Sequence, residues 1–176
     1  MYEKLQELML YIAQKSQDDP AFGALKLNKI LFFIDFEAYG AWGHPVSYAT
    51  YVHRRLGPAP YELMPAQNGL LSSSRAAISE VEYFGKPQKR LVPLVEPNMS
   101  LFNEAERKLI DDAINAFKGF NGTAASDWTH TLLPWLDTTE GEEIPLFTTF
   151  VLNKEPITQE DINWGVAELQ KIKGHV

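Results

Sequence analysis

An aspartate and a histidine three positions apart are the pair of residues in this sequence best placed for chemistry. If their segment is helical, Asp127 and His130 lie on adjacent turns of one face. A carboxylate in that position can orient an imidazole for general base catalysis, and His53 could complete a hydrolytic or metal-assisted site. The other interpretation is a buried histidine that fastens the end of its helix against Pro134 and Trp135. We favour the structural role and keep the enzyme as the alternative.

No other group of residues matches a catalytic or metal-binding pattern. The histidines, His44, His53, His130 and His175, include no pair four positions apart, so a zinc site would need ligands from distant segments. Glycine-rich phosphate loops and the GxSxG and HExxH motifs are absent. Cysteine is absent too, which removes thiolate nucleophiles, cysteine metal sites and disulfides. The sequence therefore predicts no cofactor and favours a protein that is not an enzyme.

Two basic clusters are the remaining candidates for a binding site. Arg54 and Arg55 are adjacent, and Lys86, Lys89 and Arg90 surround the loop of an expected hairpin. A β-ribbon can present such a cluster to a phosphate backbone, which would suit a transcriptional regulator. The chain carries a net charge of −7, however, so broad attraction to nucleic acid is not expected. We therefore favour a solubilising role for the hairpin loop and keep DNA binding as an alternative.

Length and composition are those of an ordinary globular protein. The 176 residues suit one domain, 1–176, and 45% of them are hydrophobic. Charges at Glu3, Lys4 and Glu7 interrupt any signal peptide, and the longest strongly apolar run, 30–34, is too short to span a bilayer. We expect a cytoplasmic protein with no membrane partner.

Hydrophobic spacing predicts mostly helices. Leucines and other apolar residues recur with helical period near the N-terminus, and the segment 25–40 is apolar on nearly every side, which is typical of a central helix. Asn103 and Glu106 have the spacing of a capping box at the start of another helix. The helices expected are 2–12, 25–40, 103–117, 124–133 with Thr123 as its N-cap, and a last one that begins at 158.

The remaining segments predict a small antiparallel sheet. The region 76–95 alternates apolar and polar residues about a loop with Gly85 and Pro87, which indicates a hairpin. A short strand is expected within 46–55 and an extended piece near 146–152. Pro65 should limit the helix after residue 60 to one or two turns. Together these elements predict a helix-rich α+β fold in a single domain.

The order of the motifs resembles the Panacea domain, also called the SocA-like antitoxin domain. The resemblance rests on an apolar helix with two lysines, a Gly-Pro turn, a small-residue helix start followed by Thr-His and Pro-Trp, and a weaker Glu-Ile-Pro. These stand at 26–33, 43–46, Tyr51, 55–61, 123–125, Thr129, His130, 134–135 and 143–145. Leu56 stands where the family usually has an aromatic residue.

The resemblance implies a non-catalytic antitoxin that neutralises a toxin by direct binding. The toxin would be encoded by the adjacent gene, and some relatives act instead as adaptors to a ClpXP-type protease. Exposed residues near the Gly-Pro turn, Arg54, Arg55 and Tyr61, are then the candidates for contacting the partner. The motif residues expected to be structural are Lys26, Leu27, Lys29, Leu31, Gly57, Pro58, His130 and Trp135.

Overall fold

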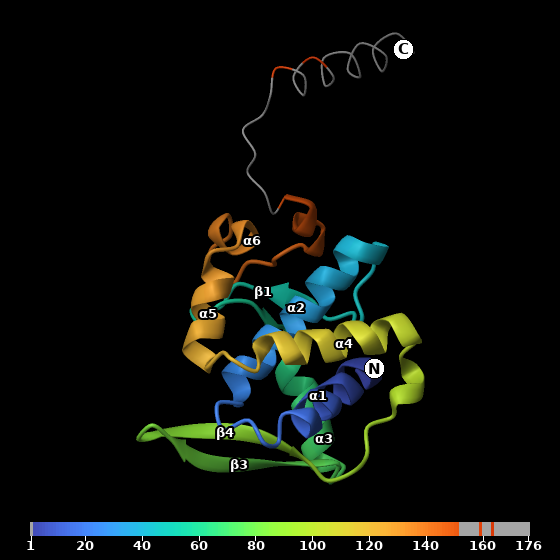
Figure 1. The fold of residues 1–176 in the computed structure, drawn as a ribbon, viewed down its shortest axis with the longest axis vertical. Coiled ribbons are helices and arrows are strands. Elements are labelled where there is room, and N and C mark those ends of the chain that lie inside the picture. The colour runs from blue at the N-terminus through green and yellow to red at the C-terminus, as the bar shows by residue number, and fades with distance from the viewer. Residues whose placement is uncertain (1, 152–158, 160–162, 164–176) are drawn as a thin grey trace.

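A central helix organises the molecule. The computed structural model describes residues 2–151 together with 159 and 163. Helix α2 (Ala24–Trp42) runs through the middle of this region and contacts α1 (Glu3–Lys15), α4 (Glu104–Phe117) and α5 (Gly122–His130) (Figure 1). As its sequence predicts, α2 buries nearly all of its circumference, because apolar residues fill every side of it.

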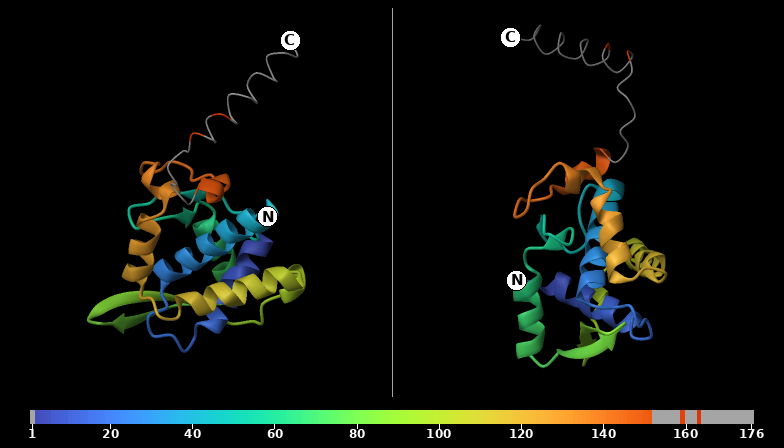
Figure 2. Two further views of the ribbon diagram at one scale, coloured as in Figure 1. Left: turned by 45° about the horizontal axis from the view of Figure 1, so that its top comes forward. Right: turned by 90° about the vertical axis from the view of Figure 1, so that its left-hand side faces the viewer.

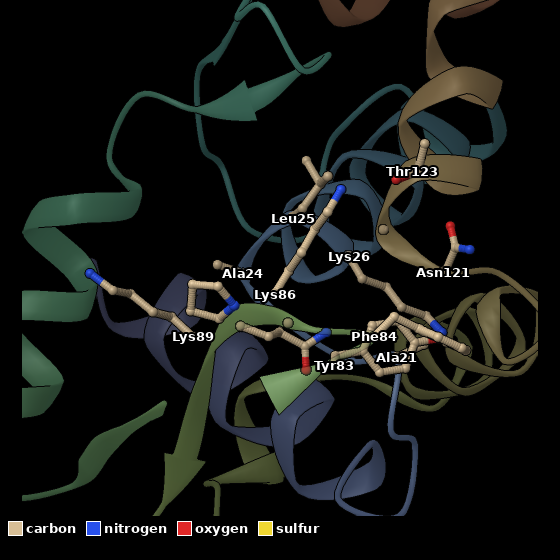
Figure 3. Close-up of a pocket in the computed structure, with 14 residues that line it drawn as sticks. Ala21, Ala24, Leu25, Lys26, Tyr83, Phe84, Lys86, Lys89, Asn121 and Thr123 are labelled. Atoms are coloured by element: carbon tan, nitrogen blue, oxygen red, sulfur yellow. The ribbon is translucent and has the colours of Figure 1, made fainter. Parts of the chain in front are cut away.

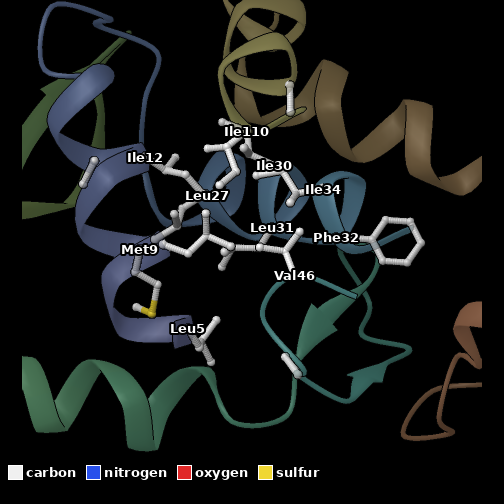
Figure 4. Close-up of a cluster of buried hydrophobic side chains, with 14 of the residues drawn as sticks. Leu5, Met9, Ile12, Leu27, Ile30, Leu31, Phe32, Ile34, Val46 and Ile110 are labelled. Carbon is white, nitrogen blue, oxygen red and sulfur yellow. The ribbon is translucent and has the colours of Figure 1, made fainter. Parts of the chain in front are cut away.

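The hydrophobic core lies between α2 and the helices packed around it. Figure 4 shows Leu5, Met9 and Ile12 of α1 turned toward Leu27 and Leu31 of α2. All five are at most 2% exposed, so this contact is solvent-free. Ile110 of α4 meets Ile30 and Ile34 of α2 in the same cluster, which makes α2 the shared wall of the core.

Shorter helical segments connect these elements. They are α3 (Leu63–Ser72), the 3₁₀ turn η1 (Met99–Leu101), α6 (Leu133–Leu136) and the 3₁₀ segment η2 (Leu146–Val151). Asn103 caps α4 through the predicted capping box: its side chain accepts from the Glu106 amide at 2.9 Å, and Glu106 accepts from the Asn103 amide at 2.8 Å. The start of α4 is therefore determined locally.

Two small antiparallel sheets complete the described part of the chain, which confirms the α+β fold. Strand β1 (Tyr51–Val52) pairs with β2 (Ala59–Pro60), and β3 (Ala76–Tyr83) pairs with β4 (Lys86–Pro93) in the predicted hairpin. The turn of that hairpin is Phe84 and Gly85, both with positive φ, as a two-residue type I′ turn requires. Figure 2 shows the hairpin at the far side of the molecule from α6 and η2.

Three expectations about element boundaries were wrong. Pro65 lies inside α3, because it falls in the first turn, where an amide has no acceptor to lose. The N-cap of α5 is Asn121, whose side chain accepts from the Ala124 amide at 2.8 Å, and not Thr123. Helix α5 ends at His130, and Pro134 belongs to α6.

The segment after α6 also departs from the expectation. Residues 146–151 form the helical turns of η2 and not an extended piece, and the Thr148 amide donates to the Pro145 carbonyl at 3.1 Å. The expected last helix, from residue 158 onward, lies outside the described residues except at positions 159 and 163. No helix in the described part of the chain is both long and apolar enough to cross a membrane.

Helix α2 carries buried charged side chains that bind loops. Asp35 is completely buried, and burial raises the pKa of its carboxyl group. Its carboxylate accepts hydrogen bonds from the Val46 amide (2.8 Å), the Ser47 amide (2.7 Å), the Ser47 hydroxyl and the Tyr51 hydroxyl (2.8 Å). Lys26 does the same at the other end, where its ammonium group pairs with Asp19 and donates to the Phe120 carbonyl at 2.7 Å. These groups fasten loops to the central helix.

Replacing Asp35 with asparagine should destabilise the fold strongly. The variant Asp35→Asn keeps the size of the side chain but turns an acceptor into a donor, which leaves buried amides and hydroxyls unpaired. We expect a loss of about 2–4 kcal/mol in the free energy of unfolding. The exposed Asp112→Asn is the control, because surface pairs such as its contact with Lys108 contribute about 0–1 kcal/mol. Urea unfolding measures both, and equal losses would contradict the anchoring role of Asp35.

Candidate partner-binding surface

The loop between β1 and β2 presents two arginines to solvent. Because Val52 pairs with Ala59, residues 53–58 form the connection, and a hydrogen bond of 2.7 Å from the Gly57 amide to the Arg54 carbonyl closes it. Arg54, Arg55 and Leu56 are exposed. Neither arginine forms an ion pair within the described residues. We call residues 53–58 the tip loop.

Side chains from α2 and α5 hold the tip loop from below. The Lys29 amine donates to the Pro58 carbonyl at 3.0 Å, and the Ser126 hydroxyl donates to the Leu56 carbonyl at 2.7 Å. Gly57 lies so close to α2 and α5 that a Cβ atom there would come within 2.5 Å of both the Lys29 amine nitrogen and the Thr129 hydroxyl oxygen. The motif residues therefore converge on one short stretch of backbone.

Burial changes the chemistry of Lys29. Its side chain is about 1% exposed, and burial lowers the pKa of its amine from 10.5 to about 7. The Pro58 carbonyl is its hydrogen-bond acceptor in the described structure. At pH values above 7 the amine is mostly neutral, so it holds the loop through a hydrogen bond and without a full buried charge.

An aromatic stack fastens the far side of the tip loop. The Trp135 ring lies 4.4 Å from the His53 ring and 4.0 Å from the His130 ring, each at an interplanar angle of 20°. The Nδ1 atom of His53 lies 3.0 Å from the Thr138 hydroxyl. The stack joins the end of β1 to α5 and α6, and in it His130 is half-buried and not fully buried as expected.

The Asp127 and His130 pair does not form in the way that general base catalysis requires. Asp127 is exposed, and no hydrogen bond joins it to His130 in the described structure. Burial, and then the charge of nearby Lys29 when its amine is protonated, lower the pKa of the imidazole. Among the described residues, no three histidine, aspartate or glutamate side chains are grouped closely enough to hold a metal ion.

Tyr61 lies apart from Arg54 and Arg55, the other two candidates for contacting the partner. Its amide donates to the Thr50 carbonyl at 2.7 Å, which places it at the base of the β1–β2 hairpin, whereas Arg54 and Arg55 lie in the tip loop. The Tyr61 side chain is 66% exposed. The three exposed candidates thus lie on one hairpin, but the strand register places the two arginines at its tip and Tyr61 at its base.

The second basic cluster is also divided. Arg90 turns inward and donates to the Ser16 and Gln17 carbonyls at 3.1 and 3.0 Å. Lys86 and Lys89 border a pocket of about 610 Å³ beside α2, but Figure 3 shows them pointing in different directions. Residues three apart on a strand face opposite sides. The cluster therefore does not form a continuous surface for phosphate groups.

Comparison with known protein families decides the relationship suggested by the motifs. Residues 27–136 match the family described as Antitoxin SocA-like, Panacea domain. The chain belongs to this family. The matched Panacea domain contains the tip loop, Lys29, and the stack of Trp135 on His53 and His130. No curated protein matches the chain, and neither does any solved structure.

Sequence reasoning missed one of the residues that hold the tip loop. Lys29, Thr129 and Gly57 stand in the Panacea motifs, but Ser126 was not singled out. It lies one helical turn before His130, and its hydroxyl oxygen is 3.5 Å from the His130 Nε2 atom. In the sequence Ser126 is only a small polar residue on the inward face of a helix. That pattern does not indicate that its acceptor is the Leu56 carbonyl, 70 residues earlier.

A side chain at Gly57 should destabilise the Panacea domain. Gly57 has φ of +95°, and a methyl group there would also meet Lys29 and Thr129. We expect Gly57→Ala to lower the free energy of unfolding by about 2–4 kcal/mol. Gly141→Ala is the matched control, because its φ is +93° and nothing lies within 4 Å of the added atom, so it should cost only about 1 kcal/mol. Equal losses in urea unfolding would show that close packing at Gly57 contributes nothing.

Lys29 should make stability depend on pH. Between pH 7 and 9.5 the unfolded chain keeps a proton on Lys29 that the folded chain has released, so the free energy of unfolding should rise with pH. The largest slope that one proton can give is about 1.4 kcal/mol in the free energy of unfolding per pH unit. Lys29→Met removes this contribution, whereas the exposed Lys108→Met should retain it. Urea midpoints at pH 7, 8 and 9 measure the slope, and parallel curves for the wild type and Lys29→Met would refute the lowered pKa.

Proposed function

We propose that this protein is a non-catalytic antitoxin that neutralises a cognate toxin by direct binding, with Arg54 and Arg55 of the tip loop in the interface. Membership of the SocA-like Panacea family supports the antitoxin role. The observation that carries the assignment of the surface is the convergence of Lys29, Ser126 and Gly57 beneath the tip loop. These contacts hold in place a segment in which Arg54, Arg55 and Leu56 face solvent.

A loop that is held in place and carries two arginines without an ion pair among the described residues is suited to binding a protein. Pre-organisation lowers the entropy that is lost when a partner binds. Arginine is among the residues enriched at binding hot spots, and its planar guanidinium pairs with carboxylates in two-point contacts. Leu56, which is 46% exposed beside the arginines, adds apolar area. The partner surface that fits the tip loop is therefore acidic with an apolar centre.

Two finer assignments belong to the same proposal. Tyr61, at the base of the hairpin, is a second contact point, because tyrosine offers a large apolar ring and a hydroxyl at low entropic cost. The toxin is the product of the adjacent gene. Delivery of the bound toxin to a ClpXP-type protease is a further role that the family resemblance suggests.

The experiment is to express the adjacent open reading frame alone and then together with this chain. We expect the neighbour to inhibit growth and this chain to restore it. A neighbour that is harmless, or one whose toxicity persists on co-expression, would refute the antitoxin role for this pair.

Purified proteins then test the surface. We expect Arg54→Ala/Arg55→Ala to weaken the affinity for the toxin at least tenfold, which is about 1.4 kcal/mol. The matched control Lys15→Ala/Lys118→Ala removes two exposed cations elsewhere and should leave the affinity unchanged. Isothermal titration calorimetry measures both. If the two double variants bind equally well, the tip loop is not the interface, whether or not the chain neutralises the toxin.

A further inference from the structure

The β3–β4 hairpin has one protected edge and one open edge. Strand β4 lies between β3 and α1, so β3 forms the outer edge of the molecule (Figure 1). Two prolines of β4, Pro87 and Pro93, lack an amide hydrogen, whereas β3 contains no proline. Proline on an edge strand prevents the addition of another strand. This protection is present on β4 and absent from β3.

The register determines which backbone groups of β3 point outward. The Arg75 and Leu94 pair is hydrogen bonded, with the Leu94 amide donating to the Arg75 carbonyl at 2.9 Å. Hydrogen-bonded and non-bonded pairs alternate along an antiparallel ladder. The pairs Ile78 with Leu91, Glu80 with Lys89, and Glu82 with Pro87 are therefore non-bonded. Their amides and carbonyls point away from the partner strand.

The outward groups of Ile78, Glu80 and Glu82 have no partner elsewhere in the described structure. No hydrogen bond outside the hairpin involves the backbone of these residues. Their side chains are exposed, Ile78 by 37%. The turn into β3, where the Arg75 amide donates to the Leu70 carbonyl at 2.9 Å, brings α3 only to the start of the strand. The outer half of the edge is thus free to pair.

Contacts on the inner side hold the hairpin in position. Arg90 donates to two carbonyls at the end of α1 and lies 5.9 Å from the Phe22 ring centre. Gln88 packs so closely on Gly23 that a Cβ atom there would come within 2.6 Å of the Gln88 Cγ atom. The open edge is therefore a pre-formed template, and a strand that joins it does not have to order the hairpin first.

We propose that the outer edge of β3 binds an extended, basic segment of a partner protein by strand addition. The backbone groups at 78, 80 and 82 supply the hydrogen bonds, and alternate side chains of the added strand supply the selectivity. Glu80 and Glu82 are the charged residues of β3, and the strand carries no cation. Lysine or arginine opposite them is favourable, whereas a second copy of this chain would place glutamate opposite glutamate. This surface is separate from the tip loop and does not depend on the partner being a toxin.

The test measures how tightly the intact protein binds a labelled peptide in which lysine and valine alternate. Two control peptides replace its lysines with glutamate, or keep the lysines and carry N-methyl groups on alternate amides. We expect the lysine peptide to bind at least tenfold more tightly than either control. If the N-methylated peptide binds as tightly as the lysine peptide, charge attraction alone explains the binding and strand addition is wrong. If the lysine peptide does not bind at millimolar concentration, the proposal is also wrong.

Amide hydrogen exchange locates the bound peptide. The lysine peptide should slow exchange at Ile78, Glu80 and Glu82 at least tenfold and leave Ser79 and Val81 unchanged, because the latter already donate within the ladder. Protection elsewhere, or protection that grows with protein concentration in the absence of peptide, would refute the proposed site or its occupant.

Two variants of Glu80 separate the contribution of its backbone amide to peptide binding from that of its charge. Glu80→Pro removes one outward amide at a position equivalent to those of Pro87 and Pro93, and should abolish binding with the melting temperature nearly unchanged. Glu80→Gln keeps the amide and should weaken binding only a few-fold. If both variants bind alike, the open amide of residue 80 is not used. Should Glu80→Pro fail to fold, the N-methylated peptide provides the same comparison on the wild-type protein.

Discussion

The structure depends on the need to satisfy charged and polar groups that a single buried helix carries into the core. An unpaired charge in an apolar interior costs several kcal/mol or changes its protonation state. Lys26 and Asp35 of α2 offset that cost by binding loop backbone, whereas burial lowers the pKa of Lys29, which hydrogen-bonds a third loop. Each loop is therefore tied to the same rigid element. A helix that fills the core with apolar side chains also sets the positions of the segments that surround it.

The consequence for the tip loop is a backbone that is held from inside the molecule. The residues of the Panacea motifs lie mostly below the surface, where Lys29, Gly57, Thr129 and Trp135 shape the tip loop, and the residues that face solvent lie just above them. This arrangement allows the exposed side chains to vary while the loop keeps its conformation. The side chains that hold the backbone of the loop and the side chains exposed on it are therefore separate sets of residues.

Local patterns predicted those parts of the molecule that local physics determines. The apolar circumference of α2, the capping box of Asn103 and the alternation in β3 and β4 each depend on neighbours within a few residues, and the structure has all three. Errors occurred where two local rules compete. Pro65 disrupts a helix interior but is tolerated in a first turn, and only the position of the helix start decides which rule applies.

The sequence by itself determined the helix-rich α+β fold, the family, and the exposed character of Arg54, Arg55 and Tyr61, because composition, periodicity and motif order are properties of the chain read in one dimension. Only the tertiary structure decided that the arginines and Tyr61 lie at opposite ends of one hairpin, and that Lys29 and Ser126 meet the same loop. Hydrogen-bond partners that lie 29 and 70 residues apart are brought within reach by packing alone. No pattern of neighbouring residues indicates that partners so far apart in the sequence will meet.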